Sequence, residues 1–403
     1  MSEHEGMTGR GMWVLAVCRD NADMTNCTSP NQQPERSVQG LLARIRQTAQ
    51  DAGGWLPFDR FMHLALYAPG LGYYARGDAQ LGLGLAPGDG SDFVTAPELS
   101  PLFGQTLAVQ VAEALRQTGT DRVWEFGAGT GALAEQVLDA LAAQGVALRQ
   151  YAIVDVSGSL RQRQQQRLAR FGDCVQWLDA LPDAMEGVVL GNEVLDAMPV
   201  QLLHRRDGVW HERGVAVSEQ PDGGNALVWH DRPTALRPPV EVDGDHDYLT
   251  EIHPQAEAFI ATLGARLRRG AAFFIDYGFG EREYYHPQRS GGTLMCHQAH
   301  RADADPLNAL GEKDITAHVN FTGIAVAAQQ AGLELLGYTT QGWFLLNCGL
   351  GALMQHANLP QRVMAQKLVL EHEMGELFKV IGLCAGPPWP ACGFVQGSRL
   401  RAL

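Results

Sequence analysis

The stretch VWEFGAGTGAL, residues 123–133, constrains the fold of this chain more than any other feature. A short apolar run is followed by three alternating glycines, Gly127, Gly129 and Gly131, and then by a segment with helical periodicity. A strand, a glycine turn and a helix in this order are typical of the ligand-binding edge of a parallel sheet. We therefore expect a small ligand to bind at this turn.

Short apolar segments alternate with helical ones, which predicts a doubly wound α/β fold around a parallel sheet. Residues 201–217 alternate around an Asp207-Gly208 turn and 225–230 supply another segment, so we expect an inserted antiparallel ribbon. The polar stretch after residue 284 is expected to be a long irregular loop. The expected core strands cover residues 122–126, 150–157, 174–178, 187–193, 271–278, 333–340 and 392–398.

The chain divides into three expected parts. Residues 1–36 are expected to be a flexible extension, or an over-long start with Met24 as the true one. Residues 37–120 form a helical N-terminal part with a glycine-rich loop, and 121–403 form the core, with insertions at about 200–250 and 284–320.

Composition limits the classes of partner and compartment. A net charge of -14 repels phosphate backbones, which argues against nucleic acid and favours a basic, arginine-bearing partner. No apolar run is long enough to insert in a membrane. The seven cysteines are scattered without a CxxC pair, so we expect a reducing compartment and no metal. That compartment is the cytoplasm for a bacterial source or the mitochondrial matrix for a eukaryotic one; the oligomeric state stays open, with a homodimer as one alternative.

The glycine turn fits two ligand classes. Gly127, Gly129 and Ala132 satisfy a dinucleotide fingerprint, and the three alternating glycines also satisfy an S-adenosylmethionine turn. Glu125 favours the second, because a carboxylate would repel a pyrophosphate but attract an ammonium and a sulfonium. Asp155, at the end of the next strand, is expected on the ribose hydroxyls. Trp177 either lies against the adenine ring or belongs to the core.

A group of polar residues is expected where a methyl acceptor would arrive. Asn192, Glu193 and Asp196 follow the fourth strand, without the two prolines and the aromatic residue typical of base amino-methyltransferases. Methyl transfer is a direct displacement in which the protein aligns the acceptor and takes up a proton. An arginine acceptor would need acids to orient its fork of donors. The candidate catalytic acids are Glu98, Glu193, Asp196 and Asp276.

Several motifs together resemble the MidA-like class I methyltransferases, from about Val38 to the carboxyl end. They are GLGYYARG at 70–77, SDFVTAPELSPLFG at 91–104, EFGAGTGAL at 125–133, NEVLDAMPV at 192–200, IDYGFGE at 275–281 and DITAHVNF at 314–321. The resemblance implies a seven-stranded, Rossmann-like core and S-adenosylmethionine as cofactor. Mitochondrial members of this family act in complex I assembly as protein arginine methyltransferases.

The resemblance also implies which residues form the site. The cofactor residues it implies are Glu125, Gly127, Gly129, Gly131 and Asp155. Two further cofactor candidates are Trp177, from its position after the third strand, and Asn192, which the resemblance places on the wall facing the methyl group. Those facing the methyl group or the acceptor are Thr95, Pro97, Glu98, Glu193, Asp196, Pro199, Asp276, Tyr277, Asp314, Thr316 and His318.

Two features depart from the family pattern. Asn320 stands where an acid is expected, and the glycine-rich loop 81–90 is longer than expected, so we expect it to act as a lid. Two alternatives to a protein arginine methyltransferase stay open. One is a non-catalytic assembly factor that retains the fold, and the other is an NAD-dependent oxidoreductase. A methyltransferase of small molecules is a weaker third.

Overall fold

A central mixed sheet organises the computed structural model, which describes residues 33–76, 95–155, 157–219, 225–298 and 301–403. Its strand order is β15-β16-β10-β5-β2-β3-β4, with β14 added beside β10. Strands β4, β3, β2, β5 and β10 run parallel, whereas β16 is antiparallel to both β10 and β15. The predicted doubly wound α/β fold is confirmed. The strands are β2 (Arg122–Phe126), β3 (Gln150–Val154), β4 (Val175–Leu178), β5 (Met185–Asn192), β10 (Leu267–Phe279), β14 (Val319–Asn320), β15 (Glu334–Thr340) and β16 (Phe378–Ala385).

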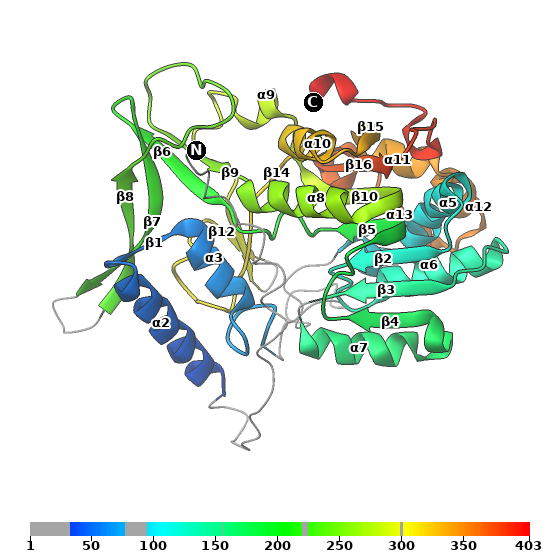
Figure 1. Cartoon of the computed structure of the whole chain (residues 1–403), viewed down its shortest axis with the longest axis horizontal. Coiled ribbons are helices and arrows are strands. Elements are labelled where there is room, and N and C mark those ends of the chain that lie inside the picture. The colour runs from blue at the N-terminus through cyan, green and yellow to red at the C-terminus, as the bar shows by residue number, and fades with distance from the viewer. Residues whose placement is uncertain (1–32, 77–94, 156, 220–224, 299–300) are drawn as a thin grey trace, which may run out of the picture.

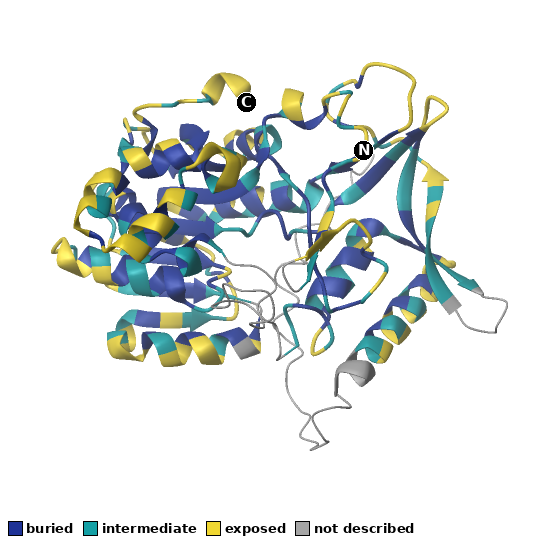
Figure 2. Cartoon of the chain, turned by 180° about the vertical axis from the view of Figure 1, so that it is seen from behind, coloured by how far each residue is buried: buried dark blue, intermediate teal, exposed yellow. Residues whose placement is uncertain are grey.

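Helices cover both faces of this sheet (Figure 1). One core contains Phe273 together with α5 (Pro101–Thr118), α6 (Ala132–Ala143) and α11 (Gln341–Asn347). The other contains Phe274 together with α8 (Pro254–Arg266) and α10 (Phe321–Gln330). Successive residues of a strand point to opposite faces, so the continuous apolar run of β10 can supply both cores. Figure 2 shows the buried sheet between helices whose outer sides are exposed.

A second sheet joins the N-terminal part to the insertion. Its order is β1-β7-β6-β9, with β8 paired to β7, and every pair is antiparallel. Asp207 and Gly208 have φ values of 49° and 74°, as a two-residue hairpin turn requires. Helices α2 (Gln33–Asp51) and α3 (Phe58–Tyr67) pack on this sheet, away from the core (Figure 1). The strands are β1 (Trp55–Pro57), β6 (Gln201–Arg206), β7 (Val209–Glu219), β8 (Asn225–Pro233) and β9 (Tyr248–Ile252).

Two expectations about secondary structure were wrong. Residues 284–313 are not an irregular loop throughout, because β11 (Met295–Gln298) and β12 (Arg301–Asp303) lie within them and form a three-stranded sheet with β13 (Asp314–Thr316). The last core strand is β16, not residues 392–398, which begin with a 3₁₀ turn. The ring of Phe394 in that turn packs on Gly337 and Gly382, where a Cβ atom would collide with it.

Some expectations fall on residues outside the described ranges. They are most of the N-terminal extension, with Met24, and the loop 81–90 with its expected role as a lid. Within the described ranges, no helix combines the length and the apolar character that crossing a membrane requires.

One buried carboxylate connects the insertion sheet to the segment that carries β11. Glu251 on β9 is fully buried. Its Oε1 accepts the backbone N–H groups of Thr293 and Leu294 at 2.8 and 3.0 Å, and its Oε2 accepts the hydroxyls of Tyr284 and Thr293 at 2.9 and 3.0 Å. A buried carboxylate is tolerated when its oxygens receive donors in this way.

We expect Glu251→Ala to lower the free energy of unfolding by about 3 kcal/mol, because several buried donors lose their acceptor. Glu241→Ala, at an exposed position of the same insertion, should change it by less than about 0.5 kcal/mol. Urea denaturation followed by circular dichroism measures both. Equal stability of the two variants would contradict the anchoring role of Glu251.

Candidate active site

The glycine turn between β2 and α6 needs backbone that glycine adopts most easily. Gly127, Gly129 and Gly131 have φ values of 60°, 53° and 83°. A Cβ atom on Gly127 would lie 3.1 Å from the Val194 side chain. The N–H of Gly127 donates to the carbonyl oxygen of Val154 at 3.1 Å, which holds the turn against the end of β3. The turn is therefore fixed at the carboxyl edge of the sheet.

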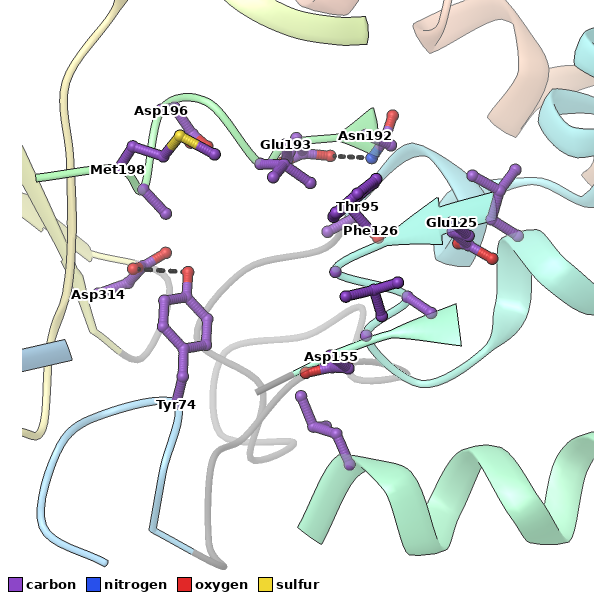
Figure 3. Close-up of a pocket in the computed structure, with 18 of the residues that line it drawn as sticks. Tyr74, Thr95, Glu125, Phe126, Asp155, Asn192, Glu193, Asp196, Met198 and Asp314 are labelled. Carbon is purple, nitrogen blue, oxygen red and sulfur yellow. Dashed lines mark hydrogen bonds between the residues drawn. The ribbon is translucent and has the colours of Figure 1, made fainter. Parts of the chain in front are cut away.

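A cavity of about 470 Å³ opens at this edge (Figure 3). Its walls come from the ends of the core strands, from α3 and the turn that follows it, and from β13. A volume in this range is typical of small-molecule sites. The predicted site residues that line it are Thr95, Pro97, Glu98, Glu125, Gly127, Gly129, Asp155, Asn192, Glu193, Asp196, Pro199, Tyr277 and Asp314.

Asp276 does not line the cavity, so its predicted contact with substrate is not what the structure shows. Its Oδ2 accepts the backbone N–H groups of Val194, Leu195 and Asp196 at 3.2, 2.9 and 3.2 Å. Its Oδ1 accepts the N–H of Tyr277 at 3.0 Å. Asp276 therefore holds the turn after β5, and it acts on the site through the residues of that turn.

Four further predicted residues also lie outside the cavity wall. Gly131 forms the N-terminal cap of α6. The indole N–H of Trp177 donates to Gln164 at 2.9 Å and its ring packs on the core, while the cavity is lined by Asp179 and Leu181 beyond the strand. The position of Trp177 thus agrees with the alternative in which its ring belongs to the core. Thr316 is buried, and the His318 ring lies edge-on to Tyr277, at 5.1 Å between ring centroids.

Glu125, in β2, and Asp155, directly after β3, form an acidic side of the cavity next to the glycine turn. Glu125 is 2% exposed, and the Tyr151 hydroxyl donates to it at 2.6 Å. Burial raises the pKa of Glu125 to about 8. Asp155 accepts the N–H of Ser157 at 2.9 Å and the amide of Gln164 at 2.8 Å. The sequence reasoning missed Gln164, which also donates to the carbonyl of Gly129 at 2.9 Å and so ties Asp155 to the glycine turn.

Glu193 lines the cavity in an uncommon backbone conformation. Its φ is 53°, a left-handed value that costs a residue other than glycine about 1 kcal/mol. Its N–H donates to the carbonyl of Ile275 at 2.9 Å, and its Oε1 accepts the Asn192 amide at 2.9 Å. Burial and the charge of Asp196 raise the pKa of Glu193 to about 8. Strain of this kind is concentrated at functional sites.

Two oxygen atoms beside Glu193 have no hydrogen-bond donor among the described residues. They are Asn192 Oδ1 and Asp196 Oδ1, and both residues line the cavity. Burial raises the pKa of Asp196, while the Tyr277 hydroxyl acts in the opposite direction. A buried acceptor without a donor is costly. The site therefore fits a ligand that brings donors to these two oxygens.

Glu98 lines the cavity but is bound to the glycine turn. Arg167 forms an ion pair with its Oε1 at 3.0 Å, and the Thr130 hydroxyl also donates to this oxygen. Glu98 lies on α4 (Ala96–Leu99) and Arg167 on α7 (Gly158–Leu168). The side chain thus braces the turn, rather than standing free to take a proton.

The cavity wall also contains residues to which the sequence analysis gave no role. His63, Tyr67, Tyr74 and His297 line the cavity. The GLGYYARG motif that includes Tyr74 was one signal for them, although the motif does not say where the side chain points. Within the described part of the chain, no group of acidic, histidine or cysteine side chains is arranged to hold a metal ion.

Residues 106–339 match a family described as S-adenosyl-L-methionine-dependent methyltransferases. The chain belongs to this family. A protein from Burkholderia thailandensis, whose crystal structure contains S-adenosyl-homocysteine, is 49% identical in sequence. Its structure matches with a TM-score of 0.86, over 94% of this chain and all of that one. A Drosophila melanogaster relative named a mitochondrial protein arginine methyltransferase NDUFAF7 homolog is 27% identical, over 91% of this chain and 92% of its own length. The human mitochondrial protein arginine methyltransferase NDUFAF7 is 26% identical, over 88% of this chain and 86% of its own length.

This methyltransferase uses S-adenosylmethionine, and the cavity fits it. The ligand supplies an electrophilic methyl group on a positively charged sulfur. Glu125 would offer a carboxyl group to its ammonium, Asp155 would offer oxygens to the ribose hydroxyls, and the turn at Gly127 and Gly129 would let the ligand approach the backbone. The comparisons support this cofactor over the nicotinamide alternative.

We expect S-adenosyl-homocysteine to release most of one proton when it binds at pH 7. The carboxyl group of Glu125, with a pKa of about 8, is largely protonated at that pH, and a nearby ammonium favours its ionised form. Affinity should accordingly rise as the pH increases from 6 to 8. Calorimetry in phosphate and Tris buffers measures the released proton.

Glu125→Gln should remove this proton release and weaken binding about tenfold, whereas Glu193→Gln should retain the proton release. Proton release that survives in Glu125→Gln but not in Glu193→Gln would show that the other carboxyl group titrates.

Proposed function

We propose that this methyltransferase modifies an arginine side chain of a protein. The observation that carries the proposal is the charge of the cavity wall. Seven acidic residues line it, and no lysine or arginine does so within the described ranges. Glu98 and Asp179 are ion-paired with Arg167 and Arg161, and Glu125 and Asp155 lie beside the glycine turn, so an acceptor would meet Glu193, Asp196 and Asp314. These acids would select a cationic acceptor with several donors, and a guanidinium carries five. The acids are Glu98, Glu125, Asp155, Asp179, Glu193, Asp196 and Asp314.

The residues around the turn after β5 suit the handling of a guanidinium. Asn192 Oδ1 and Asp196 Oδ1 are acceptors that lack donors, and a planar fork of N–H groups could satisfy both. These contacts would orient one nitrogen in a site shielded from water. The proton that this nitrogen loses as its bond to carbon forms would pass to a carboxylate. Glu193 suits this role once the arriving guanidinium has favoured its ionised form and its own proton has left to solvent, because a carboxylate with a raised pKa then takes up a proton more readily than an ordinary one.

The relatives and the composition support a protein substrate. Curated relatives from fly and human are named protein arginine methyltransferases, at 27% and 26% identity. The net charge of -14 suits a basic partner, and an assembly intermediate of a respiratory complex is the partner class that the resemblance suggests. The described cysteines are all free, which supports a reducing compartment such as the cytoplasm.

The proposal is tested by incubating the enzyme with S-adenosylmethionine labelled on its methyl group and four peptide pools. The pools carry a fixed central arginine, lysine, glutamine or histidine. We expect label in the arginine pool, recovered as methylarginine after hydrolysis. Label in another pool alone would overturn arginine specificity, and cofactor binding without transfer to any pool would favour the assembly-factor alternative.

Asp196→Asn should lower transfer to the arginine pool at least tenfold, because it removes a negative charge that faces the acceptor. Binding of S-adenosyl-homocysteine should change by less than about threefold. Asp183→Asn, at an exposed position before β5, serves as the control. Unchanged transfer in Asp196→Asn would exclude Asp196 from acceptor binding.

A further inference from the structure

A short turn between α13 (Leu359–Lys367) and β16 borders the cavity. Met374 in this turn and Phe378 at the start of β16 line the cavity wall. Phe378 pairs with Tyr277 near the carboxyl end of β10, and their two rings lie edge-on with centroids 5.4 Å apart. We call residues 370–377 the C-terminal lip, because they lie at the edge of the sheet on which the cavity opens.

The backbone of the lip is held in a defined shape. The N–H groups of Glu373 and Gly375 both donate to the carbonyl oxygen of Leu370, at 3.1 and 2.9 Å. A Cβ atom on Gly375 would collide with the backbone of Val369, so the turn requires glycine there. Gly342 on α11 also packs closely, since a Cβ atom on it would lie 3.1 Å from the carbonyl oxygen of Val369. The lip therefore presents a preformed surface beside the cavity.

The lip exposes apolar and acidic side chains together. Leu370 and Leu377 are each 41% exposed, and Met374 between them is half-buried. Glu371 and Glu373 are exposed. Among the described residues, eight of the twelve exposed large apolar side chains follow residue 340, so apolar exposure is concentrated in the part of the chain that contains the lip. Apolar exposure gathered in one region with polar groups around it is typical of an interaction surface.

The charge of the lip indicates what kind of chain it binds. Its sequence, LEHEMGEL, contains three glutamates, one histidine and neither lysine nor arginine. Arg399 forms an ion pair with Glu376 at 2.8 Å, whereas the described residues form no ion pair with Glu371 or Glu373. Two exposed carboxylates beside exposed leucines complement a basic polypeptide that also carries an apolar side chain.

We propose that the C-terminal lip binds the acceptor polypeptide next to the residue that is methylated, with its leucines contacting an apolar side chain and its exposed glutamates contacting a basic one. The inference rests on the proposed function, because it requires an acceptor that belongs to a polypeptide. The lip continues from the cavity wall through Met374, so a chain whose side chain enters the cavity passes over it. An extended chain advances about 3.3 Å per residue, so the lip meets positions close to the methylated one.

Binding of peptides to the S-adenosyl-homocysteine complex tests the lip. Three arginine-centred peptides carry different flanks: leucine with lysine, leucine with glutamate, and glycine alone. Wild type should bind the leucine–lysine peptide about tenfold more tightly than the glycine peptide, because an apolar side chain is partly buried and a charge is met. Raising the ionic strength to about 0.5 M should remove the preference for lysine over glutamate. The preference for leucine over glycine should remain.

Two double variants separate the two kinds of contact. Glu371→Lys/Glu373→Lys should reverse the charge preference, so that the glutamate flank binds more tightly than the lysine flank. Leu370→Ser/Leu377→Ser should bind leucine-flanked peptides at least fivefold more weakly than wild type, with the charge preference retained. All four side chains are exposed, so both variants should fold, which thermal unfolding checks. Affinity for S-adenosyl-homocysteine should be unchanged in both.

Glu241→Lys and Val209→Ser are the matched controls, because both positions are exposed on the insertion and neither lines the cavity. Flank preferences in the lip variants equal to those of the controls would overturn the lip as a binding surface, even if the enzyme methylates arginine. Equal binding of all three flanks by wild type would overturn it as well.

The same flanks around a central lysine or glutamine separate this inference from the proposed function. Flank preferences that depend on the lip, together with label transferred only to a lysine or glutamine centre, would support the lip and refute arginine specificity. A wild-type enzyme that binds no peptide with any centre would overturn the two together.

Discussion

The geometry of the site depends on the buried carboxylate of Asp276. It accepts three successive backbone N–H groups from the turn after β5, and so ties that turn to β10. Because the turn is held in this way, Glu193 can occupy a left-handed conformation and Asp196 can face the cavity. Three N–H groups on one carboxylate oxygen fix the backbone more tightly than packing alone. These two acids of the cavity wall therefore depend on one that lies behind them.

The two halves of the cavity have different origins. The cofactor half comes from short stretches of the core, since Glu125, the glycine turn and Asp155 all follow adjacent parallel strands. The acceptor half brings together α3, the turn after it, the end of β5 and β13. A methyl donor is the same for every member of such a family, whereas the acceptor differs. Building acceptor recognition from added segments leaves the donor site unchanged.

The extent to which the sequence predicts this structure follows the same division. The core sheet, and the residues near the glycine turn that line the cavity, could be predicted because strand, turn and acid are contiguous in the chain. Tyr74 could not be placed, because its partner Asp314 is 240 positions away. Asp276 looked catalytic because it belongs to a motif near the end of a strand, yet its side chain turns beneath the backbone of the neighbouring turn. The segment 392–398 is predicted as the last strand from its apolar pattern, because that pattern does not show that the Phe394 ring packs against Gly337 and Gly382 instead.

The acids of the cavity also explain how a wall of one charge can exist before a ligand binds. Burial raises the pKa of Glu125 and of Glu193 to about 8, so both are largely neutral at pH 7 and repel their neighbours little. A cationic ligand favours the ionised forms, and the wall gains charge only when an opposite charge arrives. Methyl transfer turns a cationic sulfonium into a neutral thioether, which weakens this attraction. The product keeps the ammonium and the ribose that Glu125 and Asp155 would contact, so only the attraction to the sulfur is lost.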